Sequence, residues 1–100
     1  MTTPHLDDPI VQHDPAAHQF HARLNGMQAV LEYRRAPGKI VFVHTEVPAA
    51  FRHRGIADAL AHAGLEYART EHLAVTTLCP FVASYIRRHP EYQTLTETGT

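Results

Sequence analysis

The chain has 100 residues, of which 44% are apolar and 19% charged, a composition typical of one small globular domain. This length excludes a two-domain enzyme. Nine Lys and Arg side chains against ten Asp and Glu side chains give a net charge of −1, which provides no broad attraction to nucleic acids. No apolar stretch is long enough to span a bilayer. We therefore expect neither a nucleic-acid partner nor a membrane association.

Cysteine and histidine usage narrows the expected class of protein further. The single cysteine, Cys79, excludes an intrachain disulfide. The first residues, MTTPHLDD, have neither the basic nor the apolar segment of a secretory signal, so we expect a cytoplasmic protein. The nine histidines do not follow the spacing of metal ligands, and we therefore expect no metal site.

The two ends of the chain differ from its middle. Proline and polar residues fill the stretch from Met1 to about Ala17 without a sustained period, and the last residues are small and polar. We expect residues 1–17 to form a flexible arm, residues 18–93 to form the domain, and residues 94–100 to form a frayed tail.

Three runs in the first half of the domain predict an antiparallel meander. QFHARL (19–24) and MQAVLEYR (27–34) alternate apolar and polar positions, and the Asn-Gly pair between them is a strong hairpin signal. After a turn at Pro37 and Gly38, KIVFVHTEV (39–47) is a nearly continuous β-branched run. This pattern predicts a central strand that is buried on both faces.

The second half predicts helix, strand and helix. From Gly55 to about His72, apolar and small residues follow the spacing of an amphipathic helix. LAVTTL (73–78) predicts a short strand. The order strand, helix, strand implies a right-handed crossover to a parallel neighbour. FVASYIRRH (81–89) lies between two prolines and predicts a second helix. The order β-β-β-α-β-α indicates an α/β fold, in which an antiparallel meander joins a parallel strand pair and helices pack on the sheet.

The junction between the 39–47 strand and the long helix reads RHRGIA (52–57). The first N–H groups of a helix have no intrahelical acceptor, and the helix dipole is positive there, so such a place favours a phosphate or pyrophosphate. Two arginines would reinforce it. An ordinary basic surface loop explains the same residues equally well, and the loop lacks the residues of a P-loop or a dinucleotide fingerprint.

RHRGIA resembles the pyrophosphate-binding motif of the GNAT superfamily of acyl-CoA-dependent N-acyltransferases, Gln/Arg-x-x-Gly-x-Gly/Ala, through Arg52, Gly55 and Ala57. The longer segments HTEVPAAFRHRGIADALAHAGLEYAR and LCPFVASYIRRHPEY look like a minimal GNAT-like subfamily. The resemblance implies that acetyl-CoA is the cosubstrate, with backbone amides across 52–57 on its pyrophosphate and the edge of the HTEV strand on its pantetheine arm. The CoA-binding residues it implies are Val47, Arg52, His53, Arg54, Gly55, Ile56, Ala57, Cys79, Pro80, Tyr85 and Arg88.

The resemblance also implies that the thioester lies between the strands 39–47 and 73–78. Glu46 or His44 is then the candidate base, because a carboxylate or imidazole can accept the proton of an attacking amine. The alternative for His44 is a structural role, and Glu46 could instead pair with the basic loop. Tyr85 resembles the superfamily tyrosine that protonates the departing thiolate, or it packs its ring under the sheet. Cys79 is a nucleophile, a CoA contact or an inert buried residue.

The sequence thus predicts a small N-acetyltransferase in which a primary amine attacks the thioester directly. The alternative is a CoA-binding or protein-interaction module of the same fold without turnover. Nothing in the chain corresponds to the acceptor-binding helices of full-length superfamily members, so we expect a shallow acceptor site or one completed by another chain. A homodimer would also cover an exposed sheet edge.

Overall fold

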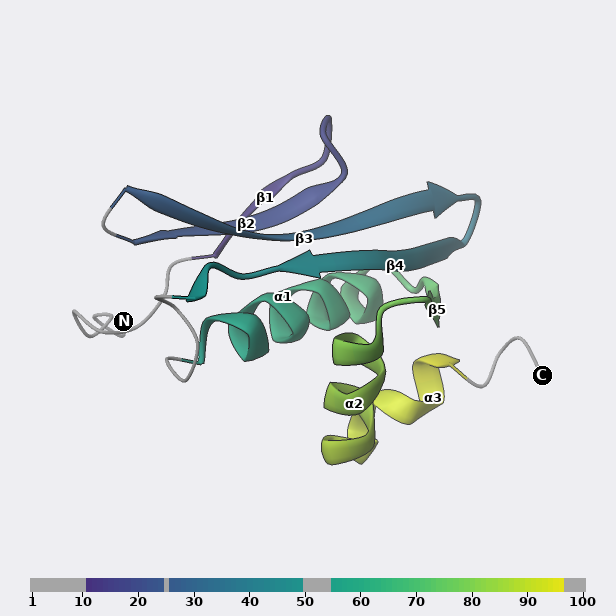
Figure 1. Ribbon diagram of the computed structural model, residues 1–100. Coiled ribbons are helices and arrows are strands. Elements are labelled where there is room, and N and C mark those ends of the chain that lie inside the picture. Colours follow the sequence, from purple (N-terminus) through teal and green to yellow (C-terminus); the bar gives the residue numbers. More distant parts are fainter. Residues whose placement is uncertain (1–10, 25, 50–54, 97–100) are drawn as a thin grey trace, which may run out of the picture.

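The computed structural model describes residues 11–24, 26–49 and 55–96, which form one sheet with helices on one of its faces (Figure 1). The described strands lie in the order β1-β2-β3-β4-β5. Their bounds are β1 Val11–Asp14, β2 Gln19–Leu24, β3 Met27–Ala36, β4 Lys39–Glu46 and β5 Ala74–Thr77. The helices are α1 Ile56–Thr70, α2 Pro80–Arg88, the 3-10 helix η2 Pro90–Tyr92 and α3 Gln93–Thr96.

The predicted α/β fold is confirmed. Strands β1 to β4 pair antiparallel in sequence order, and β4 pairs parallel with β5 from Lys39 opposite Ala74 to Phe42 opposite Thr77. The chain crosses from β4 to β5 through α1, because adjacent parallel strands need a crossover connection. Among the residues described here, no helix combines the length and hydropathy needed to cross a membrane.

Strand pairing begins earlier than the sequence predicted. Strand β1 lies within the stretch 1–17 that we expected to form an arm, while residues 1–10 lie outside the described residues. The ring of His13 on β1 stacks on the ring of Phe20 at a centroid distance of 4.2 Å. This contact gives a polar segment an anchor on the helix-covered face. At the other end, α3 extends the regular structure into the predicted tail, of which residues 97–100 are not described.

The core lies between the sheet and α1, where the backbone of the helix comes close to β4. A Cβ atom at Gly64 would lie 2.8 Å from Cε1 of Phe42 and 3.2 Å from Cδ2 of Leu31. A glycine at this position therefore lets α1 settle onto the large side chains of the sheet. The largest fully buried side chains are Phe42, Leu31, Ile40, Ile56, Leu60, Leu65 and Val82.

The prediction that the 39–47 strand is buried on both faces is wrong. Ile40 and Phe42 are fully buried against the helices, whereas Val41 and Val43 are half-buried and His44 is exposed. The reason is that the described helices cover one face of the sheet and leave the other open (Figure 1). The β-branched run reflects strand propensity rather than a second buried face.

Candidate functional site

Strand β4 carries a bulge at Val43, which sets the direction of every later side chain on the strand. On β3, Glu32 pairs with His44, but the next residue, Tyr33, pairs with Phe42. Val43 is therefore an extra residue on β4. Since side chains alternate along a strand, one extra residue exchanges the faces of all that follow.

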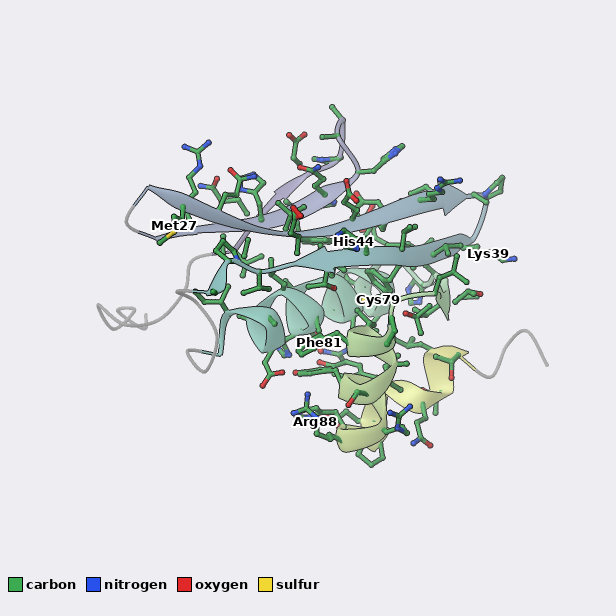
Figure 2. All side chains as sticks on the ribbon, viewed as in Figure 1. Met27, Lys39, His44, Cys79, Phe81 and Arg88 are labelled. Atoms are coloured by element: carbon green, nitrogen blue, oxygen red, sulfur yellow. The ribbon has the colours of Figure 1, made fainter. Side chains whose placement is uncertain are left out.

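The bulge moves His44 and Glu46 away from the helices. Without it, both would share the helix-covered face with Phe42; with it, both lie exposed on the open face of the sheet. Thr45 moves in the opposite sense, onto the helix-covered face. In Figure 2, His44 is labelled at the level of the sheet and Cys79 below it, beside the start of α2.

The parallel ladder between β4 and β5 ends beside this bulge. Its last pair is Phe42 with Thr77, and the N–H of Leu78 donates to the carbonyl of Phe42 at 2.8 Å. Beyond that bond, residues 43–46 of β4 have no strand partner on this side among the described residues. Backbone N–H and C=O groups on an unpaired edge can bond to a ligand that lies along them.

Cys79 lies beside this unpaired edge, on the helix-covered face of the sheet. Its sulfur is 3.1 Å from Oγ1 of Thr45, and the residue is only 4% exposed. Cys79 is the N-cap of α2, and Pro80 follows at the first helical position, where no N–H is needed. The hydroxyl of Thr77 donates to the carbonyl of Cys79 at 3.0 Å, and the N–H of Cys79 approaches the same hydroxyl oxygen at 3.1 Å. These contacts fix the position of the thiol.

Sequence analysis did not single out Thr45 or Thr77. Both are polar residues in β-rich runs, where threonine is common for its strand propensity alone. The available signal was the position of Thr77 two residues before the cysteine, a spacing at which a hydroxyl can bond to nearby backbone groups. For Thr45, the deciding feature is the bulge.

Tyr85 lies on α2 in a stack of rings. It is 6% exposed, and its ring stacks on that of His89 at 4.0 Å and on that of Tyr92 at 6.2 Å between centroids. Burial raises the pKa of the Tyr85 hydroxyl above its ordinary value, so the group stays protonated at neutral pH. Within the described part of the chain, no hydrogen bond occupies this hydroxyl.

Arg88 brings the end of α2 to the start of α1. Its guanidinium lies 3.1 Å from a carboxylate oxygen of Asp58, in the first turn of α1, and 5.5 Å from the centre of the Tyr85 ring. Arg88 is at the end of α2 farthest from the sheet (Figure 2). The guanidinium is thus held within one turn of the N-terminus of α1, where it balances the charge of Asp58.

Gly55 begins α1 in a left-handed conformation, with φ 74° and ψ 10°. Its carbonyl accepts the N–H of Ala59 at 3.0 Å, so the N–H groups of the first turn, including those of Ile56 and Ala57, point out of the helix end. The side chain of Ile56 is buried and anchors this end to the core. The predicted ligands Arg52, His53 and Arg54 lie outside the described residues.

The structure brings together some of the predicted residues and separates others. Cys79, Pro80 and Tyr85 share α2 with Arg88, which reaches the start of α1. Val47 is half-buried and packs against the core just after β4. His44 and Glu46 are on the other face of the sheet. Among residues 11–24, 26–49 and 55–96, no group of three or more His, Cys, Asp or Glu side chains is arranged to hold a metal ion.

Comparisons with known proteins identify relatives of this chain. Residues 19–95 match the family model described as GCN5-related N-acetyl-transferase. The chain is 42% identical over 83 residues to Protein NATD1 of Mus musculus, which covers 80% of this chain and 76% of that protein. It is 42% identical over 83 residues to Protein NATD1 of Homo sapiens (80% and 74%) and 39% identical over 87 residues to that of Danio rerio (82% and 79%).

Proposed function

Because the chain belongs to the GCN5-related N-acetyltransferase family, we propose that it transfers an acetyl group from acetyl-CoA to a primary amine. The observation that carries the proposal is the unpaired edge of β4 at residues 43–46, which lies beside the buried Cys79 at the start of α2. This edge offers N–H and C=O groups to the amides of a pantetheine arm, and α1 begins nearby in the chain with N–H groups that have no acceptor within the helix.

The start of α1 suits the phosphates of CoA. Its first N–H groups and the helix dipole favour an anion. The carboxylate of Asp58 is in the same turn, but its charge is balanced by Arg88 at 3.1 Å. Arg52 and Arg54, which precede Gly55 in the sequence, would add positive charge.

The chemical step needs a base for the amine and an acid for the thiolate. The amine nitrogen forms a bond to the acetyl carbon while the carbon–sulfur bond breaks. The amine proton passes to Glu46 or His44, and the departing thiolate takes the hydroxyl proton of Tyr85. Since both candidate bases lie on the open face, we propose that the acceptor approaches from that face. Cys79 contacts the sulfur end of CoA and forms no acyl intermediate.

The test is acetyl-CoA consumption in the presence of lysine peptides, polyamines and small primary amines. Glu46→Gln, His44→Gln and Tyr85→Phe are compared with the native protein, and loss of an acid or base lowers kcat by about 10²- to 10⁴-fold. Glu32→Gln is the matched control, because Glu32 pairs with His44 on the same open face but belongs to β3, away from the unpaired edge. Native rates in all three test variants would refute the assigned roles.

One observation favours a second candidate, a CoA-binding module without turnover. The candidate bases His44 and Glu46 are exposed on one face of the sheet, while Cys79 and Tyr85 are buried on the other. Calorimetric titration with CoA and acetyl-CoA separates the possibilities. Binding with acetyl transfer supports the enzyme, binding without transfer across the amine panel supports the module, and no binding at millimolar ligand refutes both.

A further inference from the structure

Tyr92 joins the turn after α2 to the side of α1 by hydrogen bonds. It is 3% exposed at the end of η2. Its hydroxyl donates to the Glu66 carboxylate at 2.6 Å and lies 3.1 Å from Nδ1 of His62. Because the one hydroxyl proton goes to Glu66, Nδ1 of His62 is the donor in the second bond. Both partners are four residues apart on one face of α1, so the two bonds hold the turn to a single rigid element.

Tyr92 is also a ring neighbour of Tyr85. The two ring centroids are 6.2 Å apart, with 28° between the ring planes, and His89 stacks on Tyr85 at 4.0 Å and 25°. The Tyr85 hydroxyl has no hydrogen bond within the part of the chain that the structure describes. The rings of the 89–92 turn, rather than a bond from its own hydroxyl, therefore set the direction of the Tyr85 side chain.

We propose that Tyr92 is a positioning residue that acts through Tyr85. Its bonds to Glu66 and His62 fix the Tyr92 ring, and that ring fixes the orientation from which Tyr85 protonates the thiolate. The inference rests on the proposed function, which gives Tyr85 that role. Tyr92 is not itself the donor, because its proton is engaged by the Glu66 carboxylate, and both burial and this bond raise its pKa.

The experiment compares Tyr92→Phe, Tyr85→Phe and the double variant in the full chain. Tyr92→Phe keeps the ring but removes both bonds, and we expect kcat to fall about tenfold with the KM for acetyl-CoA unchanged. The double variant should be no slower than Tyr85→Phe, because Tyr92 acts only through Tyr85. His62→Ala removes one bond at an exposed residue and should give a smaller fall in kcat.

Tyr67→Phe is the matched control. Tyr67 follows Glu66 on α1, but its hydroxyl accepts a 2.7 Å bond from Arg35 on β3, and its ring contacts those of His13, Phe20 and Tyr33. The variant therefore loses a comparable bond without touching the rings around Tyr85, and kcat should not change. Native kcat in Tyr92→Phe would overturn the inference while leaving the proposed function intact. So would a kcat loss in Tyr92→Phe that persists in full on the Tyr85→Phe background.

A titration readout keeps the inference testable if the native protein transfers no acetyl group, an outcome that refutes the proposed function alone. The pKa of Tyr85 is measured by NMR with carbon-13 at Cζ of the tyrosines. In Tyr92→Phe we expect it to fall toward the ordinary 10.0, because a loosened turn admits water to the ring. An unchanged pKa overturns the inference. The charged and titratable groups around Tyr85 are Asp58, Glu66, Arg88, His89, Glu91 and Tyr92.

Discussion

The hydroxyl of Thr45 lies 3.1 Å from the sulfur of Cys79 and joins β4 to the start of α2 just beyond the last pair of the β4–β5 ladder. The contact is on the helix-covered face only because the bulge at Val43 turns Thr45 inward. It places the one cysteine of the chain beside the proposed thioester.

We predict that Cys79→Ala retains acetyl transfer. Direct attack by an amine needs no acyl-cysteine, and a buried free cysteine usually acts as a small apolar side chain. The free energy of unfolding should fall by about 1 kcal/mol, since a buried side chain is shortened. The measurements are the rate of CoA release and a urea titration. Complete loss of transfer in Cys79→Ala, together with acetylated Cys79 in the native protein by mass spectrometry, would establish the covalent route instead.

Much of the sheet was predictable because local signals agree with the final pairing. Strand β2 has the predicted bounds, 19–24, since regular alternation and an Asn-Gly turn specify both register and hairpin. Helix α1 begins at Ile56 and ends at Thr70, within two residues of the amphipathic pattern. These elements depend on residues close in sequence, which a periodicity captures.

The bulge and β1 depend on contacts that no local pattern reports. The run KIVFVHTEV favours a strand throughout, so its sequence does not indicate the one-residue bulge at Val43. His44 and Glu46 lie on the open face only because of this bulge. Strand β1 pairs with β2, and its His13 adds contacts to Phe20 and Tyr33 on other strands. The side of the sheet that carries each candidate catalytic residue was therefore beyond sequence analysis.

Gly55→Val should abolish most CoA binding. Gly55 has φ 74°, a conformation that costs other residues about 1–2 kcal/mol, and relief of that strain would turn the first N–H groups of α1 away from the phosphates. We expect the Kd for CoA to rise at least about tenfold by calorimetry.

Gly38→Val is the control for backbone strain. Gly38 has φ 70° and, like Gly55, has no described atom within 4 Å of the Cβ position beyond its own residue and its chain neighbours. It lies in the β3–β4 hairpin, at the far end of α1 from Gly55 (Figure 1). This variant should lose similar stability but bind CoA normally. Equal loss of binding in both variants, or normal binding in Gly55→Val, would show that CoA does not lie at the start of α1.

Gly64→Ala should destabilise the fold although alanine is the better helix former. The added Cβ would lie 2.8 Å from Cε1 and 3.0 Å from Cζ of Phe42, a ring that is itself fully buried. Overpacking of this kind costs about 1–3 kcal/mol, which exceeds the gain in helix propensity of about 1 kcal/mol. Urea unfolding measures the net effect. A native or raised free energy of unfolding would mean that Phe42 moves aside at little cost.

The free energy of unfolding should decrease with acidity because of His13. Burial lowers the pKa of this imidazole below its ordinary 6.5, with Arg35 acting in the same direction and Asp14 against it. Below pH 6.5 the unfolded chain therefore binds a proton that the folded chain resists, so stability is full above that pH and is lost as pH falls toward the folded-state pKa. Protonation also removes Nε2 as an acceptor for the Tyr33 hydroxyl.

His13→Gln isolates this contribution from those of the other histidines. The glutamine does not titrate, so the difference in unfolding free energy between the native and variant chains should narrow as pH falls from 7.5 to 5. Urea titrations at several pH values measure that difference. The narrowing should come from the native chain, whose loss of stability on acidification exceeds that of the variant. A difference that stays constant or widens toward low pH would show that His13 is not held in its neutral form.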